Sequence, residues 1–353
     1  MPQQIRFRRT FLIIFLIGCS LHSFGQKLFS VKIDPRVEAA SIFFTLATVD
    51  TVDVKPTPST YFKAVKDFFK VYNHHPSLNW YRKLDTWDGP DMASIGLFLT
   101  DKYPFKLKVK PDVNYIRSAP IDTFLLYFNR FYKECKVADF LSKHHNEYHS
   151  ICTHGEKVIG DSKILDYVKT FFTSKQNGEF IIYADVLNNH GSNAIISENE
   201  GFEGKIISKA GYINDASKKL SENSPVIFEP ALNVVAHECS HIYLNNFTKL
   251  YFDRLVKIKN HFLTLSSGKV LNELQWENEM NELLVRVAVA KILEDKFDQE
   301  TATKEINNQS IHFKWAKDLY SFFNNYTSNR KKYKSIEDFY PEIITFLETK
   351  AGS

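Results

Sequence analysis

The sequence predicts an α+β fold that is predominantly helical, with one small sheet set between two helical regions. Short β-branched and aromatic runs bounded by turn residues cluster between 179 and 208, whereas apolar residues recur at helical spacing on both sides of that segment. The 353 residues include 13 Gly and 12 Pro, and 44% are hydrophobic. This composition excludes a disordered or collagen-like chain and argues against a turn-dense all-β architecture.

The first 25 residues have the features of an export signal peptide. Three arginines and no acidic residue accompany an apolar run over 11–18, which is too short to span a bilayer. Ser23 and Gly25 are small residues at the positions that a signal peptidase reads, and they predict cleavage before Gln26. The alternative is a bacterial lipobox over 16–19, which would leave Cys19 as a lipid-modified N-terminus. In either case we expect an exported protein, secreted or periplasmic.

The mature chain is expected to carry almost no net charge. The whole chain has a formal charge of +4, and the signal peptide contains three of its arginines. No basic stripe remains that would neutralise phosphates, so a nucleic-acid partner is not expected. No other apolar run approaches the roughly 18 residues of a membrane-spanning helix, so the mature chain is expected to have none.

Residues 26–178 are expected to form a helical N-terminal region. An Asp-Pro pair supplies an N-cap and a first-turn proline for a helix that continues to Leu46. A stripe of aromatic and aliphatic residues predicts a second helix over 59–73, and the His-His-Pro sequence at 74–76 is interpreted as a helix end. Further apolar stripes predict helices within 92–99, 124–132, 137–141 and 164–172.

Residues 179–353 are expected to form a second region, with one continuous domain over 26–353 as the alternative. A strand is predicted over 179–187, because a β-branched and aromatic run lies there between two turn signals. Shorter runs at 193–197 and 204–208 complete the predicted sheet. Helical periodicity then resumes over 230–246, 251–264, 272–294, 313–325 and 335–350.

An H-E-x-x-H motif is formed by His237, Glu238 and His241. On a helix, histidines four residues apart lie on one face, so both imidazoles can reach one Zn²⁺. Glu238 then lies beside them, placed to take a proton from a water that the metal activates and not to bind the metal. Pro230 opens a mostly apolar helix around the motif. Two core histidines bonded to side-chain partners are the alternative interpretation.

A catalytic zinc site normally has three protein ligands, so a third is expected elsewhere. The predicted helix over 272–294 begins with a polar stretch and becomes mostly apolar around Glu282. We therefore predict Glu282 as the third ligand, with Glu279 in reserve. Arg286 follows Glu282 at the i+4 position, so a simple intrahelical ion pair is the alternative.

The order of the H-E-x-x-H motif and a later Asn-Glu resembles the glutamate-type zincin metallopeptidases. The wider chain resembles the DUF4932 family of secreted bacterial proteins, and the segments that carry this resemblance are 31–38, 72–76, 235–241 and 282–286. Only the metal motif is chemically specific. The resemblance implies a zincin-like catalytic domain over 179–353 and Glu238 as general acid/base. It implies one catalytic Zn²⁺ with three ligands: His237, His241 and Glu282.

Substrate contacts are predicted less directly. In zincins an edge strand ahead of the metal helix commonly pairs with an extended substrate, and Asn193 and Ala194 lie in a segment of that kind. An ordinary sheet strand is the equally weighted alternative. An oxyanion formed at the metal needs a donor, and four side chains are chemically able, of which Tyr243 is kept as a substrate-binding candidate. The other three are Tyr212, His190 and Arg286.

Two further groups of residues receive structural interpretations. His145 and His149 share the i, i+4 spacing, but no acid follows the first of them, so a solvated helix face is favoured. Cys135 and Cys152 are able to form one disulfide in an oxidising compartment.

The sequence therefore predicts an exported zinc metallopeptidase that hydrolyses peptide bonds in a peptide or protein substrate. Two alternatives remain open. One is a non-catalytic surface or periplasmic binding protein that retains the fold, and the other is a zinc hydrolase of a non-peptide bond. The intact Glu238 favours an enzyme, because a binding module has no need of a general base.

Overall fold

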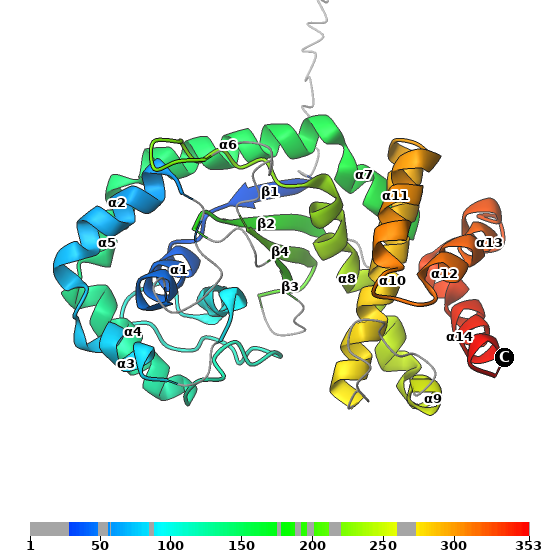
Figure 1. Ribbon diagram of the computed structural model, residues 1–353, viewed down its shortest axis with the longest axis horizontal. Coiled ribbons are helices and arrows are strands. Elements are labelled where there is room, and N and C mark those ends of the chain that lie inside the picture. The colour runs from blue at the N-terminus through cyan, green and yellow to red at the C-terminus, as the bar shows by residue number, and fades with distance from the viewer. Residues whose placement is uncertain are drawn as a thin grey trace, which may run out of the picture.

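The computed structural model describes residues 28–48, 56, 58–84, 88–174, 178–187, 192–195, 201–211, 220–259 and 273–352. The predicted export signal lies outside these ranges. Most described residues are helical and the strands form one small sheet, which confirms a predominantly helical α+β fold (Figure 1). None of the helices in the described part of the chain combines the length and apolar character needed to cross a membrane.

The sheet has four strands in the order β1-β2-β4-β3. Their bounds are Phe29–Lys32 for β1, Glu179–Asp185 for β2, Asn193–Ile195 for β3 and Lys205–Gly211 for β4. β1, β2 and β4 are parallel, and β3 runs antiparallel to β4 at one edge. The three strands predicted from the sequence are therefore present, whereas β1 was not predicted. It is only four residues long, and its pairing with β2 joins Phe29 to the distant Phe180.

The helices of the N-terminal half largely follow the predicted order. They are α1 Pro35–Thr48, α2 Thr60–Phe69, α3 Pro76–Arg82, α4 Ile121–Glu134, α5 Val137–Lys143, α6 His145–Ser162 and α7 Ile164–Phe172, with 3₁₀ helices η1 Lys70–Tyr72 and η2 Pro90–Phe98. Ser59 caps α2 by accepting a hydrogen bond from the Phe62 amide at 3.0 Å. The interpretation of 74–76 as a helix end was incomplete, because His75 is the N-cap of α3 and Pro76 is its first residue.

Different helices cover the two faces of the sheet and one of its edges. Ser208 of β4 faces Cys239 on the next helix, α8, whereas Asp185 of β2 points to the opposite face and accepts a hydrogen bond from Ser41 of α1. Glu156 of α6 accepts a hydrogen bond from the Val31 amide at 3.2 Å, so α6 lies along the edge strand β1 (Figure 1).

In the described part of the chain after the sheet, the regular elements are helices. Its helices are α8 Leu232–Leu250, α9 Phe252–Ile258, α10 Glu273–Lys296, α11 Gln299–Gln309, α12 Ala316–Phe322, α13 Asn324–Ser328 and α14 Ile336–Gly352. α8 and α10 pack together, and a buried hydrogen bond of 2.8 Å from Thr248 to Asn281 joins them. α11 was not predicted, because only Ala302 and Ile306 of its eleven residues are buried.

The boundary expected at residue 178 runs through a shared sheet and core. β1, from the first predicted region, pairs along its length with β2 of the second. α7 also packs on α8, where the rings of Phe172 and Tyr243 stack with centroids 4.5 Å apart. The sheet is therefore built from both sides of residue 178.

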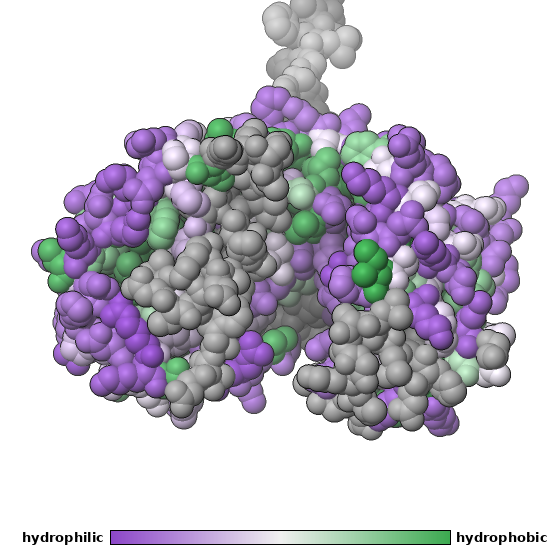
Figure 2. All heavy atoms as spheres, viewed as in Figure 1, coloured by the Kyte–Doolittle hydropathy of each residue, from purple (hydrophilic) through white to green (hydrophobic). Residues whose placement is uncertain are grey.

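Figure 2 shows a surface that is mainly hydrophilic on either side of a central indentation.

Candidate metal centre

The motif histidines lie on α8, and the sequence explains why this segment is a helix with one polar face. Val235, Ala236 and Cys239 are almost fully buried and fix the apolar side of α8 against the sheet. His237 and His241 retain side-chain exposures of 14% and 12%, so they border a cavity and do not end in the core. Their Nε2 atoms point at each other across 3.2 Å.

Glu282 of α10 faces both imidazoles. Its Oε2 lies 3.4 Å from His237 Nε2, and its Oε1 lies 3.5 Å from His241 Nε2. Two ligands bound at 2.0–2.1 Å in a tetrahedral site stand about 3.3 to 3.4 Å apart. The three side chains therefore lie as close together as the ligands of one Zn²⁺ would, and it is Glu282, not the reserve Glu279, that faces the two imidazoles.

Glu238 lies close to the same point without the same spacing. Its carboxylate and the two imidazoles have ligand atoms within 4.8 Å of one another, which is a looser grouping than the 3.4 and 3.5 Å contacts of Glu282. Glu238 is buried, with an exposed fraction of 8%. Burial, reinforced by Glu282 and Asp91 and opposed by His237, raises the pKa of the Glu238 carboxyl to about 7. A carboxyl of this kind can exchange a proton near neutral pH.

Two of the candidate ligands, Glu282 and His241, have shifted pKa values that favour the forms that bind a metal. For Glu282, burial opposes ionisation, but the hydrogen bond from His237 and the neighbouring charges outweigh it and lower its pKa to about 2. Burial, followed by the effect of His237, lowers the pKa of His241 to about 4. A carboxylate and a neutral imidazole are the forms that bind Zn²⁺.

Asn245, one turn after His241, orients that imidazole. Its Oδ1 lies 3.4 Å from His241 Nδ1. With the amide oxygen as acceptor, Nδ1 carries the proton and Nε2 keeps its lone pair for a metal. Asn245 was not predicted as a site residue, although its i+4 position relative to His241 was visible in the sequence.

A cavity of about 750 Å³ opens over these groups. α8 and α10 line one part of it, and β3 contributes Asn193 and Ala194. Asp91 of η2 and the exposed Val113 come from the N-terminal half, so both predicted regions build the cavity. Asn193 is held in place by a hydrogen bond of 3.0 Å from Ser94 of η2. The two predicted substrate-binding residues of β3 therefore lie at the cavity.

Tyr243 lies elsewhere, and its assignment to substrate binding was wrong. Its ring is 3% exposed and stacks on Phe172 in the core, and its carbonyl accepts a hydrogen bond from Tyr340. A residue two positions after His241 is rotated by about 200° around the helix, away from the metal face. Arg286 does line the cavity. The other two donor candidates, Tyr212 and His190, fall outside the described residues.

Comparison with known families adds one match. A family profile described as "Domain of unknown function (DUF4932)" matches residues 83–346. The chain belongs to the DUF4932 family. The matched part contains all four residues of the candidate metal centre, but it begins after the segments 31–38 and 72–76 that carried part of the resemblance. No curated protein and no solved structure matches the chain.

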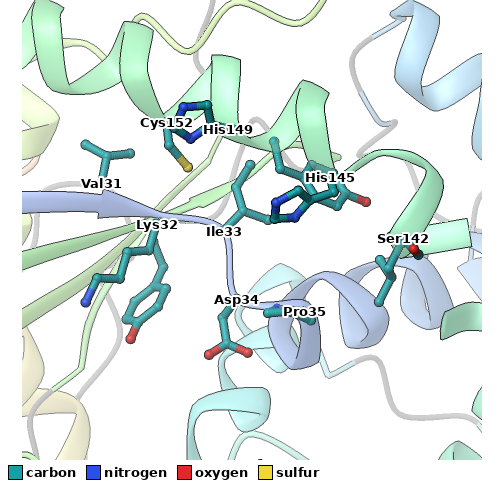
Figure 3. A pocket seen from close by; sticks show the side chains of 12 residues that line it. Val31, Lys32, Ile33, Asp34, Pro35, Ser142, His145, His149 and Cys152 are labelled. Carbon is teal, nitrogen blue, oxygen red and sulfur yellow. The ribbon is translucent and has the colours of Figure 1, made fainter.

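A second cavity of this DUF4932 protein, of about 670 Å³, lies between the end of β1 and α6 (Figure 3). His145, His149 and Cys152 line it, yet they do not converge. Within the described part of the chain, the side chains grouped closely enough to hold a metal are those around His237 and His241, and none of them lines this second cavity. Burial raises the pKa of the Cys152 thiol to about 11, so this thiol is not a reactive group.

The cysteines of the described chain are unpaired. Cys135 is buried at the end of α4, Cys152 borders the second cavity, and Cys239 is buried on α8 against Ser208. The disulfide between Cys135 and Cys152 that the sequence allowed is therefore not formed.

Proposed function

We propose that this DUF4932 protein is an exported zinc metallopeptidase with a zincin-like catalytic region. The observation that carries the proposal is the convergence of His237, His241 and Glu282 at ligand spacing, with Glu238 beside them. Two imidazoles and one carboxylate are a donor set that zinc takes in hydrolases. When bound, the ion supplies Lewis-acid polarisation of a carbonyl and a lowered pKa for water.

Glu238 is the residue that moves protons in this proposal. It takes the proton of the attacking water and delivers it to the amine that leaves when the peptide bond breaks. Its burial supports this role, because a carboxyl with a pKa near neutrality can both accept and release a proton.

The substrate in this proposal is an extended peptide. β3 is the edge strand next to β4, and its Asn193 and Ala194 line the cavity above the metal ligands. The backbone of an edge strand can add a further strand, and this fixes an extended chain without a requirement for its sequence. The short, antiparallel β3 beside the motif helix is also the feature that supports a zincin-like fold.

The test combines metal content with cleavage. The purified protein is analysed for bound metal and is then incubated with a peptide library, in parallel with Glu238→Gln. We expect stoichiometric zinc in both proteins and cleavage by the wild type alone. Absence of zinc from the wild type, or equal cleavage by Glu238→Gln, would refute the proposal.

A further inference from the structure

Arg286 binds one oxygen of Glu282 and leaves the other free of the guanidinium. Its Nε donates to Glu282 Oε2 at 3.1 Å, and its Nη2 lies 2.9 Å from the same oxygen. Each oxygen also faces one imidazole, because Oε2 lies 3.4 Å from His237 Nε2 and Oε1 lies 3.5 Å from His241 Nε2. The common two-oxygen fork between arginine and a carboxylate is therefore replaced by two contacts to one oxygen.

The far side of Arg286 is held by a different helix. Its Nη1 donates to Gln309 Oε1 at 3.0 Å, and Gln309 Nε2 donates in turn to Glu305 Oε1 at 2.7 Å. Both partners lie on α11. The guanidinium also lies 5.8 Å from the centroid of the Phe313 ring. A side chain held on several sides has lost the freedom of a solvated ion pair, so its geometry is fixed before any metal binds.

We propose that Arg286 is a positioning residue that holds the Glu282 carboxylate in the orientation in which it faces both imidazoles, with α11 holding Arg286 in turn. This inference rests on the metal site of the proposed function, and it does not depend on which bond the protein cleaves.

A matched control exists on α4. Arg130 and Glu134 form an ion pair with the same i, i+4 spacing, and Arg130 Nε lies 3.1 and 3.2 Å from the two carboxylate oxygens. Both side chains are 47% exposed. Exposed pairs of this kind contribute little, so Arg130→Met reports the effect of losing an arginine pair outside the metal centre.

The decisive experiment is Zn²⁺ competition with a chromogenic chelator, applied to the whole purified protein. Arg286→Met is expected to weaken Zn²⁺ binding by about 10-fold to 100-fold, the range found for residues that orient metal ligands. Arg286→Lys is expected to recover part of this loss, because a single ammonium can contact Oε2 without the planar fork. Gln309→Ala is expected to show a smaller loss than Arg286→Met, and Arg130→Met none.

A second readout follows the coordination itself. Co²⁺ replaces Zn²⁺ in each protein, and the visible absorption bands of Co²⁺ report the number and arrangement of its ligands. We expect altered bands for Arg286→Met and wild-type bands for Arg130→Met. Near-ultraviolet circular dichroism shows whether each variant is folded.

The outcomes separate the two proposals. If the wild type binds Zn²⁺ and Arg286→Met matches it in affinity and in its Co²⁺ spectrum, Arg286 has no positioning role and the metal site stands. If the wild type binds no Zn²⁺, the proposed function fails as well. If Arg286→Met is unfolded, Gln309→Ala decides, and wild-type affinity in that variant would overturn the inference.

Discussion

Lys209 of β4 and Asp185 of β2 form an ion pair inside the protein, with 3.5 Å between Nζ and Oδ2 and no exposed area on either side chain. The same carboxylate accepts a hydrogen bond of 2.7 Å from Ser41 of α1. The pair therefore joins two strands of the sheet to the helix that covers one of its faces. Charges this deeply buried are tolerated only when they are paired.

Removal of one partner of this pair is expected to destabilise the fold. Lys209→Met leaves the Asp185 charge buried without its cation, so the free energy of unfolding is expected to fall by about 3 to 5 kcal/mol. Urea denaturation measures the change. Lys157→Met, which removes an exposed i, i+4 pair with Asp161, is the matched control and should leave stability nearly unchanged. Similar losses in the two variants would contradict the prediction.

Stability is expected to depend on pH through Glu38. Burial, with a contribution from Asp185 and against the hydrogen bond from Tyr61, raises the pKa of this carboxyl from 4.5 to about 8. Between these two pH values the folded state keeps a proton on Glu38 that the unfolded state has released. The contribution of Glu38 to the free energy of unfolding is therefore fully present below pH 4.5 and is lost as the pH rises towards about 8. Urea denaturation at several pH values should give a shallower decline for Glu38→Gln. Identical slopes for the two proteins would show that Glu38 does not titrate in this window.

Substitutions of the candidate ligands and of Glu238 are expected to have different effects on metal binding and on catalysis. Alanine at His237, His241 or Glu282 should abolish zinc binding, because each removes one of three ligands. Glu238→Gln should keep the zinc and lose cleavage by about 10²-fold to 10⁴-fold, the contribution of a general acid or base. Metal analysis beside a peptidase assay tests both, and Glu279→Gln is the control that should change neither. Loss of zinc in Glu238→Gln would make Glu238 a ligand.

Tyr243 is expected to matter for stability and not for catalysis. Tyr243→Phe keeps the ring that stacks on Phe172, so cleavage kinetics should match the wild type. Tyr243→Ala removes a buried ring and should lower the free energy of unfolding by about 3 to 5 kcal/mol. Peptidase kinetics and urea denaturation measure these effects. A fall in kcat for Tyr243→Phe with unchanged stability would show that the Tyr243 hydroxyl takes part in catalysis.

Processing of the N-terminus tests export. Mass spectrometry of the mature protein should find Gln26 as the first residue, in line with the signal-peptide pattern. Cys19→Ala is then expected to be processed like the wild type. A diacylated Cys19 would instead establish the lipobox alternative and place the protein at a membrane surface.

Sequence patterns were sufficient where the determining signal was local. The helix around His237 and the helix around Glu282 follow from apolar periodicity, so the pairing of their ligands was accessible before the structure. Tyr243 was wrongly assigned to substrate binding because its hydroxyl was considered without the direction in which position 243 points on α8. That direction was available from the spacing to His241.

Other features depend on contacts between distant segments. β1 forms because Phe29 and its neighbours pair with residues around Phe180, and four residues carry too little alternation to reveal this. The hydrogen bond between Arg286 and Gln309 could not be predicted from the sequence for a related reason. Gln309 lies on the mostly polar α11, where no apolar stripe marks the helix.

The pairing of β1 with β2 has a practical consequence for the expression of this DUF4932 protein. The family match begins at residue 83 and so omits both β1 and α1. A fragment expressed from that position would bare the edge of β2 and the sheet face that holds Asp185, which invites association between molecules. The matched segment of this chain thus omits part of its sheet, so expression should begin ahead of Phe29.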